Sequence, residues 1–145
     1  MKTAVIGSGA WGTALAMLLC KNGHDTTLWC RSEARAAEIR ESHVNPRLAQ
    51  VALPEALQLS ADPKCVEGCQ MVVIACPSFP IRSVCKTVAP YLAPDTVVVS
   101  VTKGIEEGTL LRMSQVVAQE TGHGKIVALT GPCHAEEVGI GLPTG

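Results

Sequence analysis

Hydrophobic and polar positions alternate along this chain in short blocks, each with the length of one strand or one helix. Short apolar runs rich in Val, Ile and Leu predict strands over residues 2–7, 25–30, 57–59, 71–76, 96–102 and 125–130. Segments between them predict helices over residues 10–22, 32–41, 80–88 and 108–119, and another beginning near Ala135. This alternation predicts a doubly wound α/β fold, in which helices cover both faces of a mostly parallel sheet.

Local signals support several of these boundaries. Gly23 is placed to end the first helix, and Ser32 can cap the second. Residues 42–55 contain two prolines and no clear period, which predicts a loop, and residues 63–68 predict a polar helical turn. The segment 108–119 reads as an amphipathic helix whose core contacts are Leu111, Val116 and Val117.

A glycine-rich loop, Gly7-Ser8-Gly9-Ala10-Trp11-Gly12, follows the first predicted strand and opens the first predicted helix. In this context Gly7 allows a tight turn, Gly9 lets the backbone approach a pyrophosphate, and Gly12 lets the helix pack close to the sheet. The helix N-terminus adds free N–H groups and the positive end of its dipole. A glycine-rich turn that serves packing alone is the alternative. The strand–loop–helix order favours a Rossmann-type domain that binds NAD or NADP.

The end of the second strand bears on the choice between these two cofactors. An acidic residue there would bind the 2′-hydroxyl of NAD, but this chain has Arg31. Arg31 can pair with the 2′-phosphate of NADP or stack on adenine. Glu33 could reach the same ribose, so the sequence permits NADP without excluding NAD.

Polar residues follow the other strands, at the edge where open α/β sheets bind ligands. Pro77-Ser78 follows the strand over 71–76, and Thr102-Lys103-Gly104 follows the strand over 96–102. We expect Lys103 to project a cation into the cleft, where it could hold a phosphate or polarise a carbonyl; a solvated loop lysine is the alternative. His134 could be an acid–base group or a packing residue at a helix start.

Length, composition and charge exclude several classes of protein. The 145 residues suggest one domain, and aromatic residues are only 3% of the chain, so its core must be aliphatic. A net charge of -1 gives no basic excess for binding nucleic acid. No apolar run approaches the roughly 20 residues that a membrane span requires.

The seven cysteines show neither a Cys-x-x-Cys pair nor the spacing of a structural zinc site. We therefore expect no metal, and we expect reduced, mostly buried thiols in a cytoplasmic protein.

In their order and spacing, these motifs resemble the soluble, bacterial type of NAD(P)-dependent glycerol-3-phosphate dehydrogenase over essentially the whole chain. The resemblance rests on the glycine loop and on the segments Asn22-Gly23-His24, Leu28-Trp29-Cys30-Arg31, Ala75-Cys76-Pro77-Ser78, Thr102-Lys103-Gly104-Ile105-Glu106 and Gly131-Pro132-Cys133-His134-Ala135-Glu136-Glu137. It implies cofactor contacts at Ala10, Trp11, Arg31, Lys103 and Ala135. It also implies that the substrate, dihydroxyacetone phosphate or glycerol 3-phosphate, meets Lys103, Gly131 and Cys133.

The resemblance further implies a part of the enzyme outside this chain. In such enzymes a lysine in a helical C-terminal domain is the acid–base group, and no residue here matches it. Residues 1–145 are then the dinucleotide-binding domain of a longer protein in glycerophospholipid synthesis, inactive alone, with a possible homodimer through the other domain. The chain stops at Pro143-Thr144-Gly145, just after a predicted helix begins, which agrees with this expectation.

Three positions depart from the family pattern. Ala10 stands where the family often has Ser, and Cys133 stands where it often has a hydroxyl residue. The stretch over residues 45–54 lacks the family's Tyr-Leu-Pro. Two other readings remain: a two-domain dehydrogenase acting on a sugar nucleotide or keto acid, and a dinucleotide sensor without catalysis.

Overall fold

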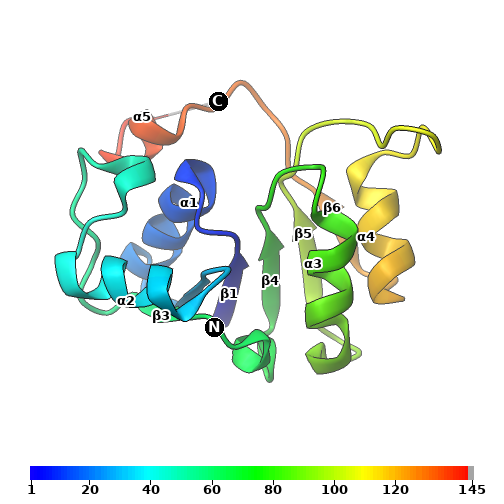
Figure 1. Ribbon diagram of the computed structural model, residues 1–145, viewed down its shortest axis with the longest axis horizontal. Helices are drawn as coiled ribbons and strands as arrows, with labels where there is room; N and C mark the ends of the chain where they lie inside the picture. Colours follow the sequence, from blue (N-terminus) through cyan, green and yellow to red (C-terminus); the bar gives the residue numbers. More distant parts are fainter. Residues whose placement is uncertain (144–145) are drawn as a thin grey trace.

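The structure, a computed structural model, describes residues 1–143 and contains six strands and five α-helices in that range (Figure 1). The strands are β1 (Lys2–Ile6), β2 (Asp25–Trp29), β3 (Gln58–Ser60), β4 (Met71–Ile74), β5 (Val97–Ser100) and β6 (Ile126–Ala128). The helices are α1 (Ala10–Lys21), α2 (Glu33–Ser42), α3 (Ile81–Val88), α4 (Met113–Thr121) and α5 (Ala135–Gly139). Short 3-10 turns are η1 (Pro46–Leu48), η2 (Pro63–Val66) and η3 (Ala89–Tyr91).

The strands form one sheet in the order β3-β2-β1-β4-β5-β6, and every neighbouring pair is parallel. The predicted doubly wound α/β fold is therefore confirmed. From β1 the chain moves outward to β2 and β3, and from β4 it moves outward in the opposite direction to β5 and β6. The topological switch point lies between β1 and β4, where Ile6 pairs with Ile74, and such a point is where this fold binds ligands.

Both faces of the sheet are buried, as helices α1, α2 and α5 cover one face and α3 and α4 the other (Figure 1). Successive side chains of β1 point to opposite faces of the sheet. Val5 belongs to the core on the side of α1, Ala4 and Ile6 belong to the core on the side of α3, and none of the three has exposed surface. Burying each Val or Ile contributes roughly 1.5–3 kcal/mol. The aliphatic core expected from composition is present.

The predicted helix over residues 108–119 is wrong at its beginning, since α4 begins at Met113. Gly108 and Leu110 have positive φ angles of 85° and 59°, which a right-handed helix does not allow. The segment instead folds back on itself: Ile105 pairs with Arg112, and the Glu106 N–H donates to the Leu111 carbonyl at 2.8 Å. Val116 and Val117 are buried as predicted, while Leu111 packs against the core from outside the helix.

The predicted loop over residues 42–55 is more ordered than the sequence indicated. It contains η1, and a single antiparallel bridge between Val44 and Ala52 closes it. Leu48 and Leu53 are buried in the core under α1 and α5. The loop is therefore anchored beside the glycine loop by its own apolar side chains.

Replacing Leu110 tests the backbone strain before α4. A leucine in the left-handed region costs roughly 1–2 kcal/mol, asparagine tolerates that region, and Leu110 is 79% exposed, so little burial is lost. We expect Leu110→Asn to raise the free energy of unfolding by about 0.5–1 kcal/mol in urea denaturation. Ile105→Asn is the matched control, because Ile105 is also exposed but does not have a positive φ angle, and this variant should not raise the free energy of unfolding. Equal effects of the two substitutions would contradict the proposed strain at Leu110.

Candidate functional site

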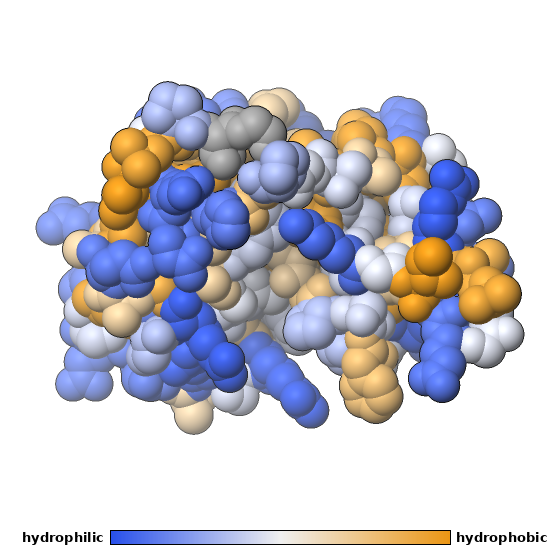
Figure 2. Space-filling model, turned by 90° about the horizontal axis from the view of Figure 1, so that it is seen from above, coloured by the Kyte–Doolittle hydropathy of each residue, from blue (hydrophilic) through white to orange (hydrophobic). Residues whose placement is uncertain are grey.

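A cavity of about 500 Å³ lies at the carboxyl ends of the central strands, within the size range of small-molecule sites. Figure 2 looks onto this end of the sheet and shows the surface hollowed near its centre. The turns after β1, β4, β5 and β6 all contribute to its wall. The lining residues are Gly9, Ala10, Trp11, Ala75, Cys76, Pro77, Ser78, Val101, Thr102, Lys103, Leu129, Thr130, Gly131, Cys133, His134, Ala135 and Glu136.

The three glycines of the loop differ in the space around them. Gly7 has a φ of 125°, and a Cβ on it would lie 2.8 Å from the Ala75 carbonyl oxygen. A Cβ on Gly12 would lie 2.0 Å from the Gly7 carbonyl oxygen, so this position allows no side chain. A Cβ on Gly9, by contrast, would meet nothing within 4 Å, because that direction opens to the cleft. The loop is thus closely packed at Gly7 and Gly12 and open at Gly9, as a loop that binds a pyrophosphate requires.

The N-terminus of α1 faces this space. Gly9 is the N-cap in an extended conformation, and its carbonyl accepts the first helical hydrogen bond from the Thr13 N–H at 2.9 Å. The first turn of α1 contains no acidic residue that would oppose an anion. The N–H groups of the first turn and the positive end of the helix dipole therefore favour a bound phosphate here. These features fit the dinucleotide that the sequence predicts.

Lys103 lies on the opposite wall of the cavity. Its exposed side chain donates to the Gly131 carbonyl at 3.3 Å, so two predicted substrate-site residues lie side by side. The turn that carries it is tied to β4, because the Thr102 hydroxyl donates to the Cys76 carbonyl at 2.7 Å. Cys133, which is partly buried, and Ala135 at the start of α5 line the same cavity. The residues that follow β4, β5 and β6 thus line one cavity together with the Lys103 side chain.

An ion-pair cluster supports the segment that follows Lys103. Arg82 on α3 binds both carboxylate oxygens of Glu106, at 2.5 and 2.6 Å, and also pairs with Glu120 on α4. The Thr109 hydroxyl donates to Glu106 as well. The Arg82 guanidinium, followed by that hydroxyl, lowers the pKa of Glu106 to about 2, and the two carboxylates raise the pKa of Arg82. Sequence analysis did not single out Arg82, whose partners are 24 and 38 residues away.

Arg31 is exposed at the end of β2 and lies outside the lining of the cavity. Its neighbours are already engaged: the Ser32 hydroxyl caps α2 by accepting from the Arg35 N–H, as predicted, and Glu33 pairs with Arg40 at 3.3 Å. The cavity therefore brings together seven of the predicted residues and leaves out Arg31, Gly7 and Gly12. The seven are Gly9, Ala10, Trp11, Lys103, Gly131, Cys133 and Ala135.

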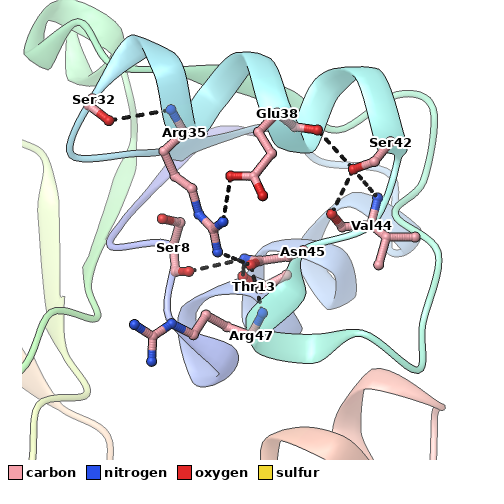
Figure 3. Close-up of polar contacts among 9 residues, drawn as sticks. All are labelled: Ser8, Thr13, Ser32, Arg35, Glu38, Ser42, Val44, Asn45 and Arg47. Atoms are coloured by element: carbon pink, nitrogen blue, oxygen red, sulfur yellow. Dashed lines mark hydrogen bonds and ion pairs between the residues drawn. The ribbon is translucent and has the colours of Figure 1, made fainter.

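Asn45 is the main residue that sequence analysis missed. It is completely buried behind the glycine loop, and its side chain contacts that loop, α1, α2 and η1 (Figure 3). One local signal was available: Asn before Pro46 favours a turn in which the Asn oxygen accepts from the N–H two residues on, as it does from Arg47 at 3.0 Å. The contacts to distant segments carried no such signal.

Most of the cysteines belong to the core, and Cys133 lines the cavity. Four of the seven are buried and three are partly buried, as the sequence predicted. Burial raises the pKa of Cys65 and of Cys85 to about 12, and that of Cys76, which borders the cavity, to about 11, so these thiols stay protonated. Within residues 1–143 no three His, Cys, Asp or Glu side chains gather as metal ligands, and no helix has the length and apolar character to cross a membrane.

Comparison with known families gives this geometry a context. The family model described as the N-terminus of NAD-dependent glycerol-3-phosphate dehydrogenase matches residues 2–145. The chain belongs to this family. Its fold is thus that of the N-terminal part of a dehydrogenase of this family, as the motifs indicated.

Individual relatives agree with the family. Over 99% of the chain it is 41% identical to glycerol-3-phosphate dehydrogenase [NAD(P)+] from Desulfitobacterium hafniense, and over 97% it is 44% identical to the protein of that name from Moorella thermoacetica. These matches cover 41% and 42% of the relatives, so the chain spans about two fifths of their length. The crystal structure of glycerol-3-phosphate dehydrogenase from Coxiella burnetii is 34% identical, with a TM-score of 0.90 over 99% of this chain and 44% of that one.

More distant structures share only the fold of this dehydrogenase domain. A ketopantoate reductase from Ralstonia eutropha and a UDP-D-ManNAc dehydrogenase from Pyrococcus horikoshii have TM-scores of 0.69 and 0.70 at 22% and 18% identity. They cover 88% of this chain. At these identities the likeness shows the fold alone, so it gives no support to the alternative of a keto acid or sugar nucleotide dehydrogenase.

The Arg82–Glu106 pair predicts a pH dependence of stability. In the folded state the ion pair lowers the pKa of Glu106 from 4.5 to about 2. The pair therefore stabilises the fold above pH 4.5, and this stabilisation is lost as the pH falls from 4.5 toward about 2. We expect Glu106→Gln to lower the melting temperature at neutral pH, and the difference from the unmodified chain to shrink across that acid range. Glu107→Gln, at the exposed neighbour, should show no such convergence. A difference independent of pH would contradict the ion pair.

Proposed function

We propose that this chain binds NAD(H) or NADP(H) at the carboxyl ends of β1 and β4, as the cofactor-binding domain of a glycerol-3-phosphate dehydrogenase. One observation carries the proposal: a single cavity joins the glycine loop to Lys103, in a chain of that family. When bound, the nicotinamide supplies or accepts a hydride. The chain's own residues bind and orient the two reactants.

The glycine loop is the proposed pyrophosphate site. The backbone N–H groups of Gly9, Ala10 and Trp11 lie at the start of α1, where an anion is stabilised by N–H donors and by the helix dipole. Backbone donors make this contact insensitive to the Ala10 side chain. The departure from the family's Ser at Ala10 therefore removes one hydroxyl and leaves the main contacts in place.

Arg31 is the proposed partner of the adenosine ribose. The Glu33 carboxylate pairs with Arg40 along α2, so it does not need to be displaced for a phosphate to approach Arg31. A guanidinium suits the 2′-phosphate of NADP because it offers several donors in one plane. This arrangement supports use of NADP(H) in addition to NAD(H).

Lys103, Gly131 and Cys133 form the proposed substrate side of the cavity. The ammonium of Lys103 would neutralise the negative charge of dihydroxyacetone phosphate or glycerol 3-phosphate, whose hydride exchange takes place at C2. The reduction adds a hydride to C2 and a proton to its oxygen, giving glycerol 3-phosphate. We place the group that moves this proton, a lysine, in a helical domain outside this chain, in keeping with the relatives' greater length.

Other features of the whole enzyme remain predictions from the sequence. These are its homodimer through the second domain, its cytoplasmic location and its part in glycerophospholipid synthesis.

Titration calorimetry of the 145-residue chain with NADH and NADPH tests the cofactor proposal. We expect both cofactors to bind. We expect Arg31→Asp to lower the affinity for NADPH relative to that for NADH by about 10-fold to 100-fold, which is the range for a lost hydrogen bond to a charged group. Lys64→Asp makes the same charge change on η2, away from the site, and should keep the ratio. An unchanged ratio in the Arg31 variant would assign the 2′-phosphate to another residue, and no binding of either cofactor would end the proposal.

Activity of the longer parent protein with dihydroxyacetone phosphate tests the substrate proposal. Lys103→Met removes the cation but keeps most of the side chain, and we expect it to lower kcat/KM by about 100-fold or more, in line with loss of one charge-stabilising donor. Lys125→Met is the matched control, because Lys125 also contacts a backbone carbonyl but precedes β6 at the other end of the sheet. Cofactor binding without any turnover in the parent would favour the dinucleotide sensor.

A further inference from the structure

Asn45 is a buried amide whose hydrogen bonds join four separate segments of the cofactor-binding edge. Its Nδ2 donates to the Ser8 carbonyl at 3.0 Å and to the Thr13 hydroxyl at 2.6 Å. Its Oδ1 accepts from Arg35 Nη2 at 2.9 Å and from the Arg47 N–H at 3.0 Å. All four hydrogen-bonding positions of the amide are therefore used, as Figure 3 shows for the labelled side chains.

The orientation of this amide follows from its partners. Arg35 and the Arg47 N–H can only donate, so the atom facing them must be the oxygen. The Ser8 carbonyl can only accept, so the atom facing it must be the NH₂ group. A flipped amide would lose three of these contacts, and the donor that faces Ser8 is thus determined by chemistry.

We propose that Asn45 is a positioning residue that holds the Ser8–Gly9 peptide with its N–H directed toward the pyrophosphate, and so sets the affinity of the glycine loop. The peptide is trans, so its C=O and N–H point in opposite directions. The Ser8 carbonyl points back to Asn45, and the Gly9 N–H therefore points forward, from a residue that lines the cavity. This proposal rests on the proposed binding of a dinucleotide.

Arg35 strengthens the effect of Asn45 on the loop. Arg35 is held between Glu38, at 2.7 Å, and the Asn45 oxygen, so its positive charge polarises the amide (Figure 3). A polarised amide is a stronger donor at its nitrogen, because hydrogen bonds in a chain reinforce one another in a low dielectric. The salt bridge on α2 thereby supports the orientation of a peptide in the glycine loop. Removing the donor at Asn45 should deprive the partly buried Ser8 carbonyl of this partner and allow the peptide to rotate.

The variants Asn45→Asp and Asn45→Ala both remove this donor, and Asn45→Ala does so without adding a negative charge. The carboxylate has nearly the same shape, still accepts from Arg35 and the Arg47 N–H, and repels the Ser8 carbonyl. We expect the Kd for ADP-ribose and for NADH to rise by about 10-fold to 100-fold, as for a lost hydrogen bond to a charged group. Adenosine 2′-monophosphate, which lacks the pyrophosphate, should bind with an unchanged Kd.

Two controls separate positioning from general stability. Thr13→Val removes one partner of the Asn45 nitrogen but keeps the Ser8 contact, so ADP-ribose affinity should stay within about twofold. Thr96→Val removes another buried hydrogen bond to a carbonyl, that of Cys69, away from the site, and should lower the melting temperature without changing the Kd. If Thr96→Val raised the Kd for ADP-ribose as much as Asn45→Asp does, the loss of affinity would reflect lower stability of the fold, and the proposal would be overturned.

Nuclear magnetic resonance of the ligand-free chain gives a readout that does not depend on binding. We expect Asn45→Asp to shift the Ser8 carbonyl carbon and the Gly9 N–H resonances, and Thr13→Val to leave both near their original positions.

If the unmodified chain binds no dinucleotide, the proposed function fails whatever these shifts are. If it binds ADP-ribose and Asn45→Asp binds equally, the role of Asn45 is refuted. Should Asn45→Asp not fold, Asn45→Ala, which leaves space for a bridging water, is measured in the same way and must weaken ADP-ribose.

Discussion

The close approach of α1 to the end of β1 governs the rest of this structure. No side chain fits at Gly12, because the Gly7 carbonyl oxygen occupies the place that its Cβ would take. This contact brings the N-terminus of α1 against the switch point of the sheet, where strands on either side diverge. The helix dipole and the N–H groups of its first turn then face the space in front of Gly9. The absence of a side chain at Gly12 thus determines where the N-terminus of α1 lies.

Once α1 is placed, the two hydrophobic cores determine where the other site residues lie. Parallel strands carry the residues that follow them to one edge, so Ala75, Thr102 and Gly131 meet there although they are far apart in the sequence. Among the described residues no buried side chain is charged, and polar contacts lie at both ends of the strands, this edge included. The Thr102–Cys76 hydrogen bond and the Arg82–Glu106 pair act there, holding the turn on both sides of Lys103.

The sequence predicted the sheet, the order of its elements and most of the cavity, for a physical reason. Hydrophobic periodicity, the glycine pattern and Ser32 as a cap are local signals, and each of them was confirmed in the structure. The predicted beginning of α4 was wrong, because residues 105–112 fold back on themselves, and Glu106 in this segment is bound by Arg82, a partner from another helix. Asn45 was missed for the same reason, as three of its four partners lie at least ten residues away. Long-range polar contacts leave no periodic trace in the chain.

The arrangement of the strands also separates Arg31 from Lys103, the two cations of the proposed site. Arg31 follows β2 and Lys103 follows β5, so the strands that carry them are three steps apart in the sheet, or about 14 Å at the usual spacing. That distance exceeds the screening length of roughly 8 Å at physiological salt, so exposed charges at the two ends interact weakly. The selection between the two cofactors that we propose for Arg31 can therefore change without disturbing the cation at the β5 end. Asn45 lies behind the glycine loop, and the effect that we propose for it concerns the pyrophosphate, which both cofactors share.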